Sequence, residues 1–151
     1  MKLNRKNITM MILSKFIENN MEKIENVSTK ANNITFMTTE GTKKVKVRTS
    51  TNYNEGGDGN TYLWTSLSKE EVYESDYDYI VLVCKEDIEK ALVFTIEELK
   101  EHFSLEQKKK KNGEVDYEMY PNFIGRKSFD ARVRSNQERI DITRYVNNYT
   151  F

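Results

Sequence analysis

One largely apolar run without alternation, YDYIVLVC at 77–84, constrains the fold of this chain more than any other stretch. A strand without polar alternation must be covered on both faces, so the run predicts a buried central strand. A second run, ALVF at 91–94, follows after a short polar segment and is expected to pair with it as a hairpin. The length of 151 residues favours a single domain, spanning 1–151, built around this strand.

The start of the chain has the spacing of an amphipathic helix. Apolar residues recur there at intervals of three and four, which predicts a helix over about 8–24 with Asn7 as its cap. These apolar residues are Ile8, Met11, Ile12, Phe16, Ile17, Met21 and Ile24. Two strand-like runs follow at 33–39 and 43–50, and Gly41 is expected to supply the positive φ of the turn between them.

Two capping boxes mark further helix starts. Ser68 and Glu71 are three residues apart, as are Thr95 and Glu98, and each pair can satisfy free N–H groups at the first turn of a helix. The first pair predicts one short helical turn. The second predicts a helix over about 96–103.

The remaining segments are assigned from their turn residues. Segment 51–60 is rich in Gly and Asn and is expected to be a flexible loop, and 107–113 is expected to be a solvated loop. Segment 114–120 alternates as a half-buried strand that Pro121 ends, and Asp141 is expected to cap a short terminal helix. This order predicts an α+β domain with a mixed central sheet and flanking helices.

The formal charge is zero overall but unevenly distributed along the chain. Residues 1–50 carry ten Lys and Arg against four Asp and Glu, whereas residues 51–104 carry four against thirteen. Residues 105–151 carry ten against seven. Such a distribution creates a basic region that attracts phosphates, or it lets basic and acidic segments neutralise each other.

The second strand of the predicted hairpin carries a cation at every second position. Side chains alternate across a strand, so Lys44, Lys46 and Arg48 share one face while Val45 and Val47 share the other. Two interpretations are open: a solvated outer face, or a cationic surface that binds phosphate.

From about residue 8 onward, the order of these segments resembles the restriction-endonuclease-like, PD-(D/E)XK superfamily. The resemblance rests on a helix, a hairpin whose second strand reads VKVRTS, a Trp in YLWTSLSKEE, and the segments DYIVLVC and LVFTIEEL. A closing segment also resembles such domains through Ile140, Asp141, Tyr145, Asn147 and Asn148. The resemblance implies a restriction-endonuclease-like fold and, where the motif is complete, metal-dependent cleavage of nucleic acid.

The catalytic motif of that superfamily is degenerate here. Its members place an Asp near the start of the first hairpin strand and Asp/Glu-x-Lys on the next, positions that correspond to Asn32 or Asn33 and to Lys46-Val47-Arg48. Mg²⁺ takes oxygen ligands, and Lys46 has no lone pair to offer. The resemblance therefore implies no catalytic residue, no metal site and no cofactor, with Arg48 alone keeping a phosphate-stabilising role.

We therefore expect a divergent, catalytically inactive nuclease-fold domain that binds DNA or RNA, such as an accessory protein of a phage or mobile element. The residues expected to contact nucleic acid are Lys44, Lys46, Arg48, Ser50 and Trp64. Trp64, with Tyr53 and Tyr62 near it in the sequence, is suited to stacking on bases, and core packing is its alternative role.

Two alternative functions stay open. The acidic segment 70–101 favours a protein-interaction or inhibitor module with a basic protein partner. The other alternative is a nuclease that uses Mg²⁺ through a relocated carboxylate. The candidates for that carboxylate are Glu18, Glu22 and Glu40.

The rare residue types exclude several kinds of site. Cys84 is the only cysteine, which excludes an intrachain disulfide and is typical of a reducing compartment. His102 is the only histidine, so zinc sites that need two are excluded. No apolar run approaches the roughly 20 residues of a membrane span, so we expect a cytoplasmic protein with no membrane partner. Further basic residues, which would add non-specific phosphate affinity, stand at 108–111 and at Arg126, Lys127, Arg132 and Arg134.

Overall fold

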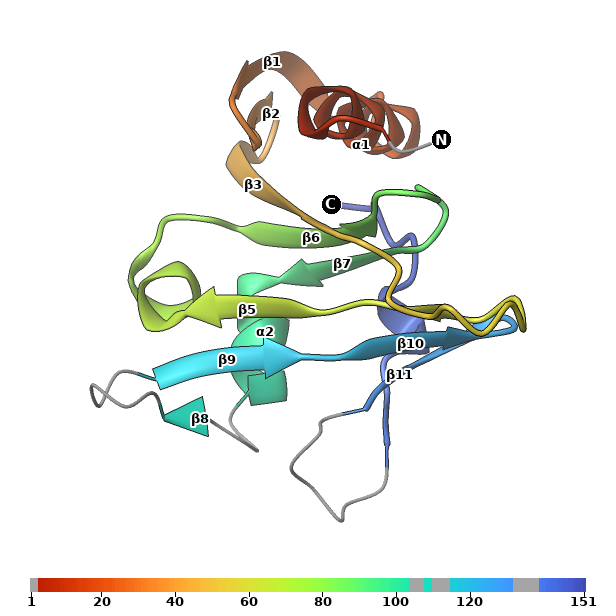
Figure 1. Cartoon of the computed structure of the whole chain (residues 1–151). Helices are drawn as coiled ribbons and strands as arrows, with labels where there is room; N and C mark the ends of the chain where they lie inside the picture. Colours follow the sequence, from red (N-terminus) through yellow and green to blue (C-terminus); the bar gives the residue numbers. More distant parts are fainter. Residues whose placement is uncertain (1–2, 104–107, 110–114, 132–138) are drawn as a thin grey trace.

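A computed structural model describes residues 3–103, 108–109, 115–131 and 139–151 (Figure 1). At its centre is a five-stranded sheet in which β3 and β6 are parallel and all other neighbours are antiparallel. In spatial order its strands are β1 (Ile24–Lys30), β2 (Asn33–Thr38), β3 (Gly41–Ser50), β6 (Tyr79–Cys84) and β7 (Ala91–Thr95). The predicted α+β class, the mixed sheet and the turn at Gly41, whose φ is 111°, are confirmed.

β6 is the buried central strand that its sequence predicts. All six of its residues are buried, and it lies between β3 and its hairpin partner β7. Its side chains alternate between two cores: Val81 and Val83 pack towards α1 (Arg5–Asn19), and Ile80 and Leu82 pack on the opposite side. The sheet is therefore the middle of three layers.

α1 lies across one face of the sheet, as expected, but its bounds differ from the prediction (Figure 1). Asn4, not Asn7, is the cap: its side-chain oxygen accepts from the Asn7 N–H at 2.8 Å. The helix ends at Asn19 rather than near residue 24, because Ile24 already begins β1. β1 was not predicted, since as an edge strand it buries little and shows no regular apolar alternation.

Asn20 is a buried polar residue that joins the end of α1 to the end of the described chain. Its amide donates to the backbone carbonyls of Phe16 at 2.8 Å and Tyr149 at 2.7 Å, and its oxygen accepts from the Phe151 N–H at 2.8 Å. Burying an amide costs little free energy when its hydrogen bonds are made, whereas losing the amide would leave its buried partners without hydrogen bonds. Asn20 thus fixes residues 149–151 beneath the helix.

The core between α1 and the sheet is built around one aromatic ring. The ring of Phe16 is fully buried and lies 5.1–6.0 Å, centroid to centroid, from four other rings. They belong to Phe36, Tyr79, Tyr149 and Phe151. The aromatic contacts of this core therefore gather at one position of the helix, Phe16.

The opposite face of the sheet is covered by α2 (Ile96–Phe103), by the π-helical turn η1 (Glu70–Glu74) and by two small antiparallel sheets. One small sheet has the order β5-β9-β8 and the other β12-β11-β10-β4. The strands of the first are β5 (Thr65–Ser68), β8 (Lys108–Lys109) and β9 (Val115–Met119). Those of the second are β4 (Thr61–Tyr62), β10 (Pro121–Ile124), β11 (Lys127–Asp130) and β12 (Ile140–Asp141). A 3-10 turn, η2 (Thr143–Tyr145), follows β12.

Both capping boxes are confirmed. The Glu71 N–H donates to the Ser68 hydroxyl at 3.1 Å, and the Ser68 N–H donates to the Glu71 carboxylate at 3.2 Å. Thr95 and Glu98 make the same reciprocal pair at 3.1 and 2.9 Å, and α2 has the predicted bounds. These short-range rules hold because every donor and acceptor is local.

Three predictions for the second half are corrected. Residues 108–109, expected in a loop, form β8 against β9; residues 107 and 110–114 lie outside the described residues. Pro121 ends β9 but also begins β10, where a first strand position tolerates its missing N–H. Asp141 lies in β12 and accepts from the Thr143 N–H at 2.9 Å, so a single 3-10 turn replaces the terminal helix.

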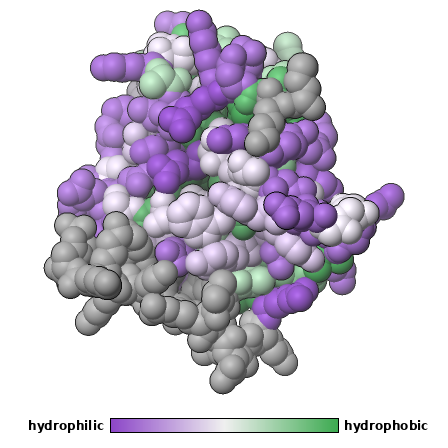
Figure 2. Space-filling view, viewed as in Figure 1, coloured by the Kyte–Doolittle hydropathy of each residue, from purple (hydrophilic) through white to green (hydrophobic). Residues whose placement is uncertain are grey.

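None of the helices among the described residues is long and apolar enough to cross a membrane. Figure 2 shows that the face seen in Figure 1 is mostly hydrophilic, with a band of intermediate hydropathy across its middle.

Replacing Phe16 by Ala is expected to lower the free energy of unfolding by about 3–5 kcal/mol, because the cavity left among four rings cannot close fully. Urea denaturation would measure the loss. Met10→Ala on the same helix is the matched control, since Met10 is 47 % exposed, and its effect should stay within about 0.5 kcal/mol. Equal losses in both variants would contradict the assignment of this core.

Candidate functional site

The cationic face of β3 is directed away from α1, towards the segment that contains η1. Val45 and Val47 are fully buried against the helix side, as the alternation predicts. On the other side, the Lys46 Nζ lies 2.9 Å and the Arg48 guanidinium 3.6 Å from the same Glu71 carboxylate oxygen. Lys44 pairs with Asp76. The cations are therefore matched by acids from the following segment.

Glu71 is the centre of this charge cluster. Burial opposes its ionisation, but the contact with Lys46, the Ser68 N–H and nearby Arg48 outweigh burial and hold the pKa of the Glu71 carboxyl below its ordinary value. The same carboxylate closes the capping box of η1. Glu71 therefore connects a local helix signal to a long-range ion pair.

The predicted binding residues of β3 are less available than a free cationic strand would be. The Lys46 side chain is only 18 % exposed and also lies over the Tyr77 ring, with Nζ 5.3 Å from the ring centroid. Lys44 is paired, and of these three cations only Arg48 reaches the polar pocket described below. Lys44 and Lys46 are thus engaged in ion pairs within the chain, and their contact with nucleic acid stays a prediction.

The acidic segment 70–101 is likewise used partly within the chain. Asp78 accepts the Lys44 backbone N–H at 2.8 Å, and Asp76 and Glu71 form the ion pairs given above. Glu70 and Glu74 are exposed on η1. Self-neutralisation between segments is thus the arrangement found at β3.

The carboxylate found beside Arg48 is that of Glu71, which is not among the three candidates considered from the sequence. Glu40 forms an ion pair with Lys23 at 3.6 Å, and Glu18 lies on α1, across the sheet from the Arg48 side chain. Glu22 lies between the end of α1 and the start of β1. Among the described residues, no group of three or more His, Cys, Asp or Glu side chains is placed to hold a metal ion.

Asn32 and Asn33, which the resemblance aligns with the first catalytic position, have structural contacts. The Asn32 amide donates to the Val47 carbonyl at 2.9 Å, and the Val47 N–H donates to the Asn32 carbonyl at 2.8 Å. The Asn33 side-chain oxygen accepts from the Tyr77 hydroxyl at 3.2 Å. Both therefore tie the hairpin to its neighbours.

A polar pocket of about 230 Å³ lies at the carboxyl ends of the parallel strands β3 and β6. Three cations line it, Arg5, Arg48 and Lys85, and its described lining contains no carboxylate. The remaining lining residues are Asn32, Val47, Thr49, Ser50, Thr51, Tyr53, Trp64, Thr65 and Ser66. Cationic groups and hydroxyls can donate hydrogen bonds to an anionic oxygen.

Three of the five predicted binding residues, Arg48, Ser50 and Trp64, line this pocket. One Arg48 nitrogen donates to the Ser66 carbonyl at 2.7 Å, which fixes the guanidinium at the wall. The Ser50 hydroxyl donates to the Thr51 carbonyl at 2.9 Å and accepts a hydrogen bond from the Trp64 N–H at 3.0 Å. Buried Ser50 thus positions the backbone of Trp64.

Sequence reasoning missed Arg5 and Lys85. Arg5 stands in the first turn of α1, where no acidic residue is present although an acid would be favoured there. Lys85 directly follows the buried strand β6. The sequence signals for these two residues were a basic residue at a helix start, Arg5, and a basic residue at the carboxyl end of a central strand, Lys85.

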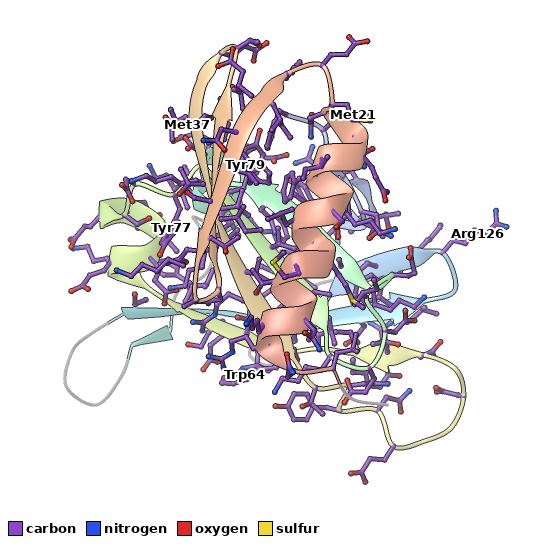
Figure 3. The ribbon with its side chains drawn as sticks, turned by 90° about the horizontal axis from the view of Figure 1, so that it is seen from above. Met21, Met37, Trp64, Tyr77, Tyr79 and Arg126 are labelled. Carbon is purple, nitrogen blue, oxygen red and sulfur yellow. The ribbon has the colours of Figure 1, made fainter. Side chains whose placement is uncertain are left out.

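Trp64 and Tyr53 are the exposed aromatic residues of the pocket, with 40 % and 59 % of their surfaces accessible. Figure 3 shows Trp64 beside the N-terminal end of α1, opposite the end near Met21.

Segment 51–60 has no helix or strand, as expected, but side-chain hydrogen bonds connect its two ends. The Asn54 amide donates to the Asp58 carboxylate at 2.6 Å and to the Asn60 carbonyl at 2.8 Å.

Of the further basic residues identified in the sequence, Arg126 and Lys127 do not line this pocket. Arg126 and Lys127 are exposed at the turn between β10 and β11, and Figure 3 shows Arg126 projecting away from the body of the protein. Arg132 and Arg134 lie outside the described residues.

Cys84 and His102 have separate buried environments. The Cys84 thiol contacts the Glu86 carboxylate at 3.3 Å, and burial raises its pKa to about 11, so little reactive thiolate forms near neutral pH. His102 Nε2 lies 2.7 Å from Asp130, which also accepts the Tyr120 N–H at 2.9 Å.

Comparison of the chain with protein-family models, with curated proteins and with solved structures finds no match in any of the three. The resemblance to the restriction-endonuclease-like superfamily therefore stays a prediction.

The role of Glu71 predicts a pH dependence of stability. Because its folded pKa is lowered from 4.5, Glu71 stabilises the fold above its unfolded pKa and loses this contribution as pH falls through the lower folded value. The difference in unfolding free energy between wild type and Glu71→Gln should therefore shrink between about pH 7 and pH 3.

Gln retains the capping box, so this variant isolates the charge of Glu71. Glu70→Gln removes a neighbouring exposed acid and serves as control, with a difference expected to stay nearly flat with pH. A flat profile for both variants would contradict the role of the ion pairs.

Proposed function

We propose that this chain is a non-catalytic, nucleic-acid-binding domain and a divergent relative of the restriction-endonuclease-like superfamily. The order of helix, hairpin, central strand and second helix supports the relationship, as does a mixed sheet with α1 across it. The polar pocket is the observation that carries the binding function.

The charge balance of the pocket favours a phosphate. Arg5, Arg48 and Lys85 come from three segments far apart in the sequence, and no carboxylate from the described residues lines the same space. Arg48 keeps further N–H donors beyond those used for Ser66 and Glu71. The carboxyl ends of adjacent parallel strands are also a frequent place for ligands in open sheets.

The first turn of α1 supports the same assignment. Arg5 and Lys6 stand at the positive end of the helix dipole, a position that is unfavourable for cations. A bound anion would offset this repulsion. The arrangement therefore has a cost to stability that phosphate binding would explain.

The absence of cleavage is proposed from the chemistry of the degenerate motif. The Glu71 carboxylate is the acid that contacts Arg48, and the Lys46 ammonium lies 2.9 Å from the same carboxylate. A divalent cation would have to displace that ammonium and would find one protein carboxylate instead of a pair.

Removal of two pocket cations tests binding. The double variant Arg5→Ala/Lys85→Ala should bind labelled DNA or RNA more weakly and lower the log–log salt slope by roughly 2 if each contacts one phosphate. Fluorescence anisotropy at increasing salt concentrations measures both quantities.

Arg126→Ala/Lys127→Ala removes the same charge from the distant turn and is the matched control. Its affinity and salt slope should stay close to wild type. Equal weakening by both double variants would show attraction to net charge alone, and no salt-sensitive binding by wild type would contradict the proposed function.

No cleavage of single- or double-stranded DNA or RNA is expected with Mg²⁺ or Mn²⁺, because Lys46 occupies the place of a metal-binding acid. Gel analysis after long incubation measures this directly. Cleavage that disappears in Glu71→Gln would contradict the prediction and assign Glu71 a catalytic role.

A further inference from the structure

An apolar pocket of about 510 Å³ adjoins the polar pocket, and nothing in the proposed phosphate contacts uses it. Four aromatic side chains line it, with Leu63, Asn122 and Ala131 completing the wall. The aromatic residues are Tyr53, Tyr62, Trp64 and Tyr120. Tyr53 and Trp64 line both pockets, so the two spaces meet at these rings.

The aromatic wall is held in place by its backbone. The Trp64 N–H donates to Ser50, the Tyr53 N–H donates to the Tyr62 carbonyl at 2.8 Å, and the Leu63 N–H donates to the Pro121 carbonyl at 2.8 Å. The rings of Trp64 and Tyr53 nevertheless keep much of their surface exposed. Exposed rings on a hydrogen-bonded backbone next to cations are suited to stacking rather than to core packing.

We infer that the two pockets together take unpaired nucleotides of a single strand, with a phosphate in the polar pocket and a base against Trp64 and Tyr53. This inference rests on the proposed function and names its substrate class. Bases of a duplex are stacked within the helix and cannot lie on a protein ring, whereas those of a single strand can. The carboxylate-free, cationic lining beside the rings favours an occupant with phosphates over a neutral or basic one.

Trp64 is the only tryptophan of the chain, so its fluorescence reports directly on this surface. Oligothymidine of about 12 nucleotides, within the usual range of single-strand sites, should quench Trp64 and bind more tightly than a blunt duplex of equal length. Tyr53→Ala should weaken oligothymidine binding roughly five- to 100-fold, the usual loss for one stacked base, with little effect on duplex binding.

Trp64→Ala should weaken binding of labelled oligothymidine similarly, with Trp64→Phe between it and wild type. Tyr73→Ala is the matched control, because Tyr73 is also 40 % exposed but lines neither pocket. Thermal unfolding of each variant checks that the fold is kept, and Tyr53, as the more exposed ring, gives the decisive variant.

The outcomes separate the inference from the proposed function. Equal binding of single strand and duplex, without a fluorescence change, would overturn the single-strand inference and leave nucleic-acid binding standing. Absence of binding to either would overturn both. A Trp64 response to an acidic, tyrosine-containing peptide but not to oligothymidine would overturn the inference and assign the pockets to a protein partner.

Discussion

The requirement to cover β6 on both faces determines the arrangement of the other elements. Its two sets of side chains need separate cores, so α1 must lie on one side and α2 with the small sheets on the other. Pairing β6 in parallel with β3 then requires a crossover, and segment 51–78 provides it. This crossover carries Tyr53, Trp64 and Glu71, so part of the candidate site results from how the central strand is enclosed.

The parts of the fold that could be predicted depend on local chemistry or on strong apolar patterns. The run at 77–84, the hairpin partner at 91–94 and both capping boxes fall in this group. The end of α1 could not be predicted, because Asn20 stops the helix through contacts with residues 129 and 131 positions away. β1 was missed because an edge strand can be polar on both faces.

The candidate site was predictable only in part, for a similar reason. Strand alternation placed Lys46 and Arg48 on one face, and the uneven charge distribution allowed their neutralisation, but neither signal identifies Glu71 as the acid. Arg5 and Lys85 join Arg48 only through tertiary structure. Single residues without a motif give no pattern to detect, and their convergence is what distinguishes a pocket from a set of surface cations.

The contacts of Asn20 have a consequence for how the chain folds. The aromatic core beneath α1 needs Tyr149 and Phe151, which are separated from the helix by most of the given sequence. Contacts of such long sequence separation must close large loops before they contribute, which slows folding. The helix layer should therefore not consolidate until residues 149–151 have joined it.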